Sequence, residues 1–154
     1  MAASDNSGVK FPPPLLYLLG LLAGWWLQRV HPLPTLPKNV ALGGGILLIV
    51  AGLAVARAGV RAVWKAKSSI VPIRPTTAIA TDGPYALTRN PMYLGLVFIY
   101  IGIAFLIHSA WALLLLPLVV VGIDRLVIAK EETYLRGKFG DSYISYCSRV
   151  RRWI

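Results

Sequence analysis

The sequence predicts an all-α, polytopic membrane protein with about four transmembrane helices, and three observations support this fold class. Of the 154 residues, 56% are hydrophobic and only 14% are charged, and the mean hydropathy is +0.65. Such a composition is typical of membrane proteins. Three apolar runs are also long enough for helices of about 20 residues; they extend from Pro13 to Val30, from Val40 to Val60 and from Met92 to Ile128. A soluble helical bundle is disfavoured because the runs keep almost no polar face.

The first two runs are expected to form one helix each, separated by the proline-rich segment 31–38, since proline cannot continue a helix. The third run is long enough for a hairpin of two helices that folds back near His108 and Ser109. We therefore expect a single membrane domain. It comprises a flexible N-terminus (1–12), two N-terminal spans (13–60), and a unit of polar loop, helical hairpin and C-terminal helical tail (61–154).

Small residues at helical spacing predict close packing between these helices. They are Gly20 and Gly24 in the first run, and the Gly43-Gly44-Gly45 cluster with Gly52 in the second. A nucleotide-binding glycine loop is the alternative, functional interpretation, but such a loop needs a strand before it and a helix after it. We therefore expect packing contacts at these glycines.

The distribution of basic residues predicts the orientation in the membrane. Twelve of the sixteen lysines and arginines lie in segments 57–89 and 130–152, which a helical hairpin would bring to the same side. The positive-inside rule places these segments and the C-terminus in the cytoplasm. The same rule accounts for the net charge of +10 without nucleic acid. We expect no metal site, because Cys147 is the sole cysteine and the two histidines are far apart.

The polar residues before the third run predict a binding site at the start of a helix. Asn90 suits the N-cap position and Pro91 suits the first helical position. The exposed backbone N–H groups of such a helix, together with the neighbouring guanidinium of Arg89, favour an anionic group. A capped transmembrane helix with an interfacial arginine is the alternative interpretation.

Acidic residues near the end of the same run provide the opposite charge at the same membrane face. Asp124 and Glu131 are seven residues apart, as are Arg125 and Glu132, so we expect each pair to share a helix face. Glu131 and Glu132, with Arg89, would give a site with separate cation-binding and anion-binding ends. Such a site suits a zwitterionic, cationic cofactor, whereas a solvated helix face is the alternative.

The helix that carries these carboxylates is expected to continue out of the membrane to about Phe139 and to end at Gly140. Asp141 is expected to cap a short final helix that holds Tyr143 and Tyr146.

Two motifs in the C-terminal half resemble a known family. The first motif contains Gly83-Pro84-Tyr85 and Arg89-Asn90-Pro91-Met92-Tyr93-Leu94-Gly95; the second contains Glu131-Glu132-x-x-Leu135 and Phe139-Gly140-x-x-Tyr143-x-x-Tyr146. In this order, with a helical hairpin between them, they are similar to the isoprenylcysteine carboxyl methyltransferase and phospholipid methyltransferase superfamily. The chain departs from the pattern twice. Asn90 stands where the carboxyl methyltransferases usually have histidine, and Arg151 stands where many relatives have proline.

The resemblance implies an integral membrane enzyme that uses S-adenosyl-L-methionine without a Rossmann domain and binds it at the cytoplasmic ends of the last spans. It implies cofactor-binding positions at Gly83, Pro84, Tyr85, Arg89, Pro91, Tyr93, Glu131 and Glu132. It implies catalytic positions at Arg89, Asn90, Tyr93 and Glu132. In this hypothesis the two glutamates bind the ammonium group or ribose hydroxyls, while Arg89 and the helix N-terminus hold the carboxylate. Gly83 would let the backbone approach closely, and Tyr85 and Tyr93 would orient the cofactor.

The expected acceptor is lipophilic and enters from the lipid bilayer. A prenylcysteine-like carboxylate is already nucleophilic at neutral pH, whereas a phospholipid amine must first lose a proton; the sequence does not choose between them. Two alternatives remain. One is an NADPH-dependent enzyme like the membrane sterol reductases, which share a pattern that includes Tyr146-Cys147. The other is a non-catalytic membrane subunit of the same fold.

Overall fold

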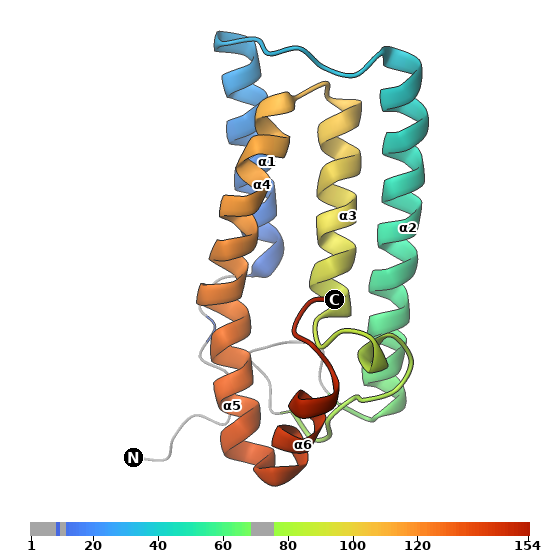
Figure 1. The fold of residues 1–154 in the computed structure, drawn as a ribbon, viewed down its shortest axis with the longest axis vertical. Coiled ribbons are helices and arrows are strands. Elements are labelled where there is room, and N and C mark those ends of the chain that lie inside the picture. Colours follow the sequence, from blue (N-terminus) through green and yellow to red (C-terminus); the bar gives the residue numbers. More distant parts are fainter. Residues whose placement is uncertain (1–8, 10–11, 69–75) are drawn as a thin grey trace.

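A computed structural model describes residues 9, 12–68 and 76–154. This part of the chain is helical and contains no strand, which confirms the predicted all-α class. Four longer helices form a bundle (Figure 1): α1 (Pro13–Val30), α2 (Lys38–Lys65), α3 (Pro91–Leu106) and α4 (Ala110–Ile123). At one end of the bundle lie α5 (Ala129–Phe139), α6 (Asp141–Arg149), the 3₁₀ helix η1 (Gly83–Ala86) and the C-terminus. The α1–α2 and α3–α4 connections lie at the other end.

Two of the described helices are long and apolar enough to cross a membrane. They are α2, with 28 residues, and the continuous helix over Ala110–Phe139, with 30 residues. The apolar helix α3 is shorter, at 16 residues. The bounds of α1 are those predicted from the sequence. Large side chains on the outer faces are exposed, among them Leu47 at 69% and Leu118 at 70%. An apolar surface of this kind is expected where lipid covers the protein, so the structure supports membrane association, and the count of four spans stays a prediction.

Glycines allow α2 and α3 to pack closely. A Cβ built on Gly52 would lie 2.6 Å from the carbonyl oxygen of Gly95, and one on Gly45 would lie 2.9 Å from that of Gly102. The predicted role of small residues in packing is therefore confirmed at Gly45 and Gly52. It is wrong for Gly43, which faces open space.

The same packing role is confirmed on α1. A Cβ on Gly24 would lie 2.4 Å from the Cα of Ala112, and one on Gly20 would lie 2.5 Å from the side chain of Val119. Both contacts are with α4, so α1 and α4 form a second closely packed pair.

The third apolar run folds back where the sequence predicted. His108 has φ +49°, and Ser109 precedes α4. The Ser109 hydroxyl accepts a hydrogen bond from the N–H of Ala112 (3.1 Å) and donates one to the carbonyl of Gly24 (2.9 Å). It therefore caps α4 and also ties the turn to α1.

Several predicted boundaries need correction. The second helix extends to Lys65 rather than Val60, because its last turns carry alanine, arginine and lysine, which favour helix. As expected, Gly140 ends α5, with φ +50°. Gly140 also occupies the N-cap position of α6, so Asp141 is the first helical residue rather than the cap.

Some expectations fall outside the described residues. Of the N-terminal segment 1–12, which we expected to be flexible, the structure describes only Val9 and Pro12. Arg74, which contributes to the predicted charge bias, also lies outside the described part, as does Pro75.

Candidate functional site

A π-helical segment, η2 (Asp124–Ile128), joins α4 to α5 and changes which carboxylates face the same way. An α-helix advances about 100° per residue, so seven residues return close to the starting face, and one inserted residue makes that spacing eight. Accordingly, Asp124 and Glu132, eight residues apart, both contact Arg152. The prediction that Asp124 and Glu131 share a helix face is therefore wrong. The corresponding prediction for Arg125 and Glu132 is wrong for the same reason.

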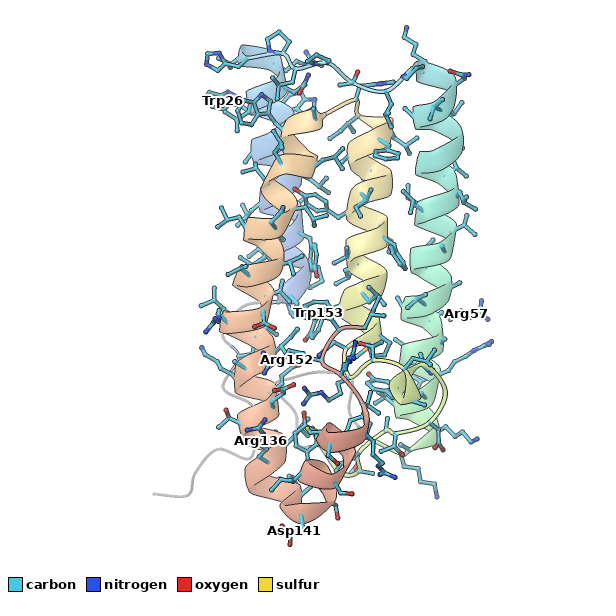
Figure 2. The ribbon with its side chains drawn as sticks, in the orientation of Figure 1. Trp26, Arg57, Arg136, Asp141, Arg152 and Trp153 are labelled. Carbon is cyan, nitrogen blue, oxygen red and sulfur yellow. The ribbon has the colours of Figure 1, made fainter. Side chains whose placement is uncertain are left out.

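Glu132 is the centre of a buried ion-pair cluster and is 5% exposed. Arg152 contacts both of its oxygens, with Nε 3.1 Å from Oε1 and Nη2 2.5 Å from Oε2. Arg89 Nη1 lies 3.0 Å from Oε1, and the more exposed Arg136 lies 4.0 Å from Oε2. Figure 2 shows Arg152 in the space between the start of α3 and the α5 helix. Buried charges are stable only when they are paired in this way.

Arg152 also reaches the carboxylate of Asp124, which lies 3.1 Å from its Nη1 atom. Hydrogen bonds to Glu132, followed by the attraction of the two carboxylates, raise the pKa of Arg152 against the opposing effect of burial. The neighbouring Trp153 donates its indole N–H to Asp124 at 3.3 Å. The C-terminal residues thus close one side of the site (Figure 2).

Part of the Arg89 guanidinium is already occupied, because its Nη1 atom is paired with Glu132. Its Nη1 atom also donates to the Sγ of Cys147 at 2.7 Å. Its Nε atom is buried and has no hydrogen-bond partner among the described residues. An unpaired buried donor is costly and uncommon, so this N–H could donate a hydrogen bond to an anionic ligand group without losing an existing one.

The C-terminal backbone is bound to the loop before α3. The N–H of Arg89 donates to the carbonyl of Arg151 at 3.0 Å. The carbonyl of Arg152 accepts from the Thr88 hydroxyl (3.1 Å) and from the side-chain amide of Asn90 (2.9 Å). Asn90 occupies the predicted N-cap position, but its side chain makes no capping hydrogen bond. Pro91 is the first residue of α3, as predicted.

Glu131 points to a different environment from that of Glu132. Its Oε1 atom accepts a hydrogen bond from the hydroxyl of Tyr93 at 2.7 Å. Within the described residues it forms no ion pair. It lines a cavity of ≈130 Å³ together with Tyr85, Arg89, Asn90, Tyr93, Glu132, Tyr134, Tyr143 and Tyr146, among others. The fold therefore brings most of the predicted site residues to a single cavity.

Buried tyrosines form the wall of this cavity on the α6 side. Tyr146 donates its hydroxyl to the carbonyl of Tyr85 at 2.7 Å, which holds η1 against α6. Burial raises the pKa of Tyr146 to about 12, and it raises the pKa of Tyr85 further above the ordinary value. Both hydroxyls are therefore neutral hydrogen-bonding groups at physiological pH.

Three predicted cofactor positions do not line this cavity. Gly83 and Pro84 line a second cavity beside α2, and Pro91 is buried as the first residue of α3. No described protein atom lies within 4 Å of a Cβ built on Gly83, so the protein itself makes no close approach there. Gly83 is instead suited to its φ of +61°, which residues with a side chain rarely adopt.

Sequence reasoning assigned Arg152 only to the charge bias of the tail, and it missed Trp153. Both residues contact Asp124, and Arg152 also contacts Glu132. The sequence did contain a signal for such a residue, because carboxylates in apolar surroundings, such as those of Asp124 and Glu132, need a cationic partner. The sequence could not indicate which of several arginines supplies it.

The chain is similar to known methyltransferases. The family model described as "Phospholipid methyltransferase" matches residues 40–142. An uncharacterized protein of Haemophilus influenzae is 40% identical over 63 residues, which are 41% of this chain and 100% of that protein. A protein-S-isoprenylcysteine O-methyltransferase of Schizosaccharomyces pombe is 38% identical over 72 residues, which are 47% of this chain and 30% of that protein. Protein-S-isoprenylcysteine O-methyltransferase B of Arabidopsis thaliana is 21% identical over 146 residues, 94% and 67% of the two chains. No solved structure matches the chain.

Proposed function

Because the chain belongs to the phospholipid methyltransferase family, we propose that it transfers a methyl group from S-adenosyl-L-methionine to a lipophilic acceptor. The acceptor is a prenylcysteine-like carboxylate or a phospholipid amine. Of the curated relatives, two are named protein-S-isoprenylcysteine O-methyltransferases. The family description instead names phospholipid methyltransferase, so both acceptors belong to the proposal.

The proposed enzyme is a single multi-pass membrane domain in which α1, α2, α3 and the helix over 110–139 are the four spans. The helices α5 and α6 and the C-terminus lie at the end of the bundle where residues 57–68 and 76–89 also lie. The basic residues of these segments support a cytoplasmic location for this end by the positive-inside rule. A soluble methyl donor could then enter from the cytoplasm while the acceptor enters from the bilayer.

The observation that carries the proposal is the contrast between Glu131 and Glu132. Glu132 is neutralised by arginines, whereas Glu131 lines the cavity and, among the described residues, has a tyrosine hydroxyl as its partner. A partly buried carboxylate of this kind favours a cationic ligand. Arg89 lines the same cavity, and its buried Nε atom, which has no hydrogen-bond partner among the described residues, favours an anionic one. The residues therefore fit the zwitterionic amino-acid end of S-adenosyl-L-methionine.

The cavity is small for a whole cofactor. Its volume of ≈130 Å³ is below the roughly 300–1,000 Å³ of ordinary ligand sites. We therefore assign it to the amino-acid end alone, with Glu131 next to the ammonium group and Arg89 Nε next to the carboxylate. Tyr85 and Tyr93 line the cavity and orient the bound group.

The donor supplies a methyl group bound to a sulfonium, which is already activated toward displacement. The protein therefore needs to align the acceptor with that methyl group and to exclude water. Arg89, Asn90 and Tyr93 line the cavity and would fix the amino-acid end of the donor, which orients the methyl group toward the acceptor. We assign Glu132 a positioning role, because it holds Arg89 and Arg152 in place rather than remaining available to a ligand.

Calorimetric titration of the purified protein with S-adenosyl-L-methionine tests the proposal, and NADPH serves as the comparison ligand. We expect saturable binding of the methyl donor and at least a tenfold loss of affinity in Glu131→Gln. Asp141→Asn is the matched control, since it also removes one carboxylate, on the exposed start of α6; its affinity should stay within twofold. Binding of NADPH alone, or equal affinity in wild type and Glu131→Gln, would contradict the proposed site.

Transfer is then measured with a donor that carries a labelled methyl group. Phosphatidylethanolamine and a farnesylated cysteine with a free carboxylate are offered in separate reactions. We expect label in one lipid product, and its chemical class identifies the acceptor. Donor binding without label in either lipid would contradict the proposed acceptor classes while leaving the donor site in place.

A further inference from the structure

A second cavity lies beside α2, outside the proposed donor site. Its volume is ≈730 Å³. One wall is α2 and the other is segment 79–84, and the α2 wall consists of Ala54, Arg57, Ala58, Arg61, Ala62 and Lys65. We refer to this cavity as the basic groove.

The cations of the basic groove repeat along one face of the helix. Arg57, Arg61 and Lys65 are spaced by four residues, so they follow one another on successive turns. All three are exposed, and Figure 2 shows Arg57 on the outer side of α2, away from α3. The alanines between them leave room along the helix surface.

These cations are not neutralised by the described part of the protein. None of the three takes part in an ion pair there. Asp82 is the sole acidic residue among those that line the basic groove, and it forms no ion pair with them. At the same end of the bundle, by contrast, Arg89 and Arg152 are paired with Glu132. The basic groove therefore offers concentrated positive charge to an external anion.

The surface of α2 on the other side of Arg57 is suited to acyl chains. Ile46, Val50 and Leu53 are each at least half exposed and precede Arg57 at helical spacing. Residues 39–56 carry no charge and extend about 27 Å at 1.5 Å per residue, close to the roughly 30 Å of bilayer hydrocarbon. This length puts Arg57 at the level where lipid phosphates lie.

We propose that the basic groove binds the phosphate of an anionic phospholipid, with the acyl chains along the apolar face of α2. Arginine suits this ligand because its planar guanidinium can donate two hydrogen bonds to a phosphate. The charge of the groove is complementary to an anionic headgroup, and its position matches the interface. The inference goes beyond the proposed function, since lipid binding here requires neither methyl donor nor transfer.

Topology alone explains why basic residues flank a span, but it does not require a cavity between them. Here the cations, the alanine surface and segment 79–84 enclose one. A specific site therefore predicts a different result from a diffuse attraction between basic surface and anionic membrane. If the site is specific, removing positive charges from the basic groove must weaken the binding of an anionic phospholipid more than removing the same number of charges elsewhere on the protein.

Native mass spectrometry in detergent with added phosphatidylglycerol tests this difference. The groove variant is Arg57→Gln/Arg61→Gln/Lys65→Gln. The control variant is Arg125→Gln/Lys130→Gln/Arg149→Gln, which removes three exposed cations from the same end of the bundle. We expect the groove variant to lose at least tenfold in phosphatidylglycerol affinity and the control to stay within twofold. Phosphatidylcholine, whose headgroup has no net charge, should bind less tightly to wild type.

Equal losses in the two triple variants would overturn the proposal, because they would indicate a diffuse charge effect. Displacement of phosphatidylglycerol by millimolar glycerol 3-phosphate would also overturn it, because the groove would then take a soluble phosphate. Donor binding and thermal unfolding report whether the groove variant is folded. If it is not, Arg61→Gln replaces it, with an expected loss of at least threefold, and unchanged affinity in this variant would overturn the proposal.

Discussion

The two adjacent glutamates are expected to respond in opposite ways to the same substitution. In Glu132→Gln the cluster loses its central negative charge while Arg89 and Arg152 remain. Arg89 has a side chain that is 13% exposed and has no other carboxylate within ion-pair distance among the described residues. Arg152 is 34% exposed and keeps its contact with Asp124. The cost therefore arises mainly at Arg89.

Loss of one partner from a buried ion pair costs about 3–5 kcal/mol, and the exposure of Arg152 favours the lower end, about 3 kcal/mol. In a chain of this size 1 kcal/mol corresponds to about 2–4 °C in unfolding temperature, so we expect a decrease of about 6–12 °C. In Glu131→Gln the new amide oxygen can still accept the Tyr93 hydroxyl, so the cost stays below about 1 kcal/mol. Donor affinity should show the reverse order, with the larger loss in Glu131→Gln.

Thermal unfolding of both variants and wild type in one detergent, followed by tryptophan fluorescence, measures the first effect. Calorimetric titration of the same samples with the methyl donor measures the second. The reasoning would be refuted if Glu131→Gln lowered the unfolding temperature as much as Glu132→Gln does. It would also be refuted if Glu132→Gln unfolded at the wild-type temperature.

Four further substitutions test the fold and are measured by thermal unfolding. Gly52→Ala should cost about 1–3 kcal/mol, because its Cβ would lie 2.6 Å from a carbonyl oxygen of α3. Gly43→Ala, in open space on the same helix, should be neutral or stabilising by up to about 1 kcal/mol. Tyr146→Phe should cost about 1–3 kcal/mol, since the buried carbonyl of Tyr85 loses its partner. Ser109→Ala should cost about 1–2 kcal/mol, because it removes a helix cap.

The helical framework was predictable because apolar length and proline placement depend on local sequence. The helix from Pro13 to Val30 and the turn at His108 and Ser109 were both predicted and are both present. Gly45 and Gly52 were expected to pack, although the sequence could not identify α3 as their partner. Partner choice depends on how surfaces complement one another in three dimensions, and helical periodicity alone does not contain this information.

The location of the predicted site residues was anticipated in part. Motif resemblance indicated Tyr85, Arg89, Tyr93 and Glu131, and these residues line one cavity. The ion-pair pattern was not predicted, because a π-helical turn shifts the face of every residue after it. The turn has no sequence signature that periodicity can detect, so Asp124 was assigned to the wrong partner.

The π turn also explains why two neighbouring glutamates can have different roles. With regular α-helical spacing, Asp124 and Glu131 would share a face. The Glu131 carboxylate would then lie near Asp124 and compete with it for Arg152. The inserted residue instead places Glu132 beside Asp124 and Arg152. Glu131 then lies against Tyr93, without an ion pair in the described part of the chain. The π segment therefore separates the two glutamates, so that Glu132 is held by arginines while Glu131 keeps the side of the cavity, where a cationic methyl donor could contact it.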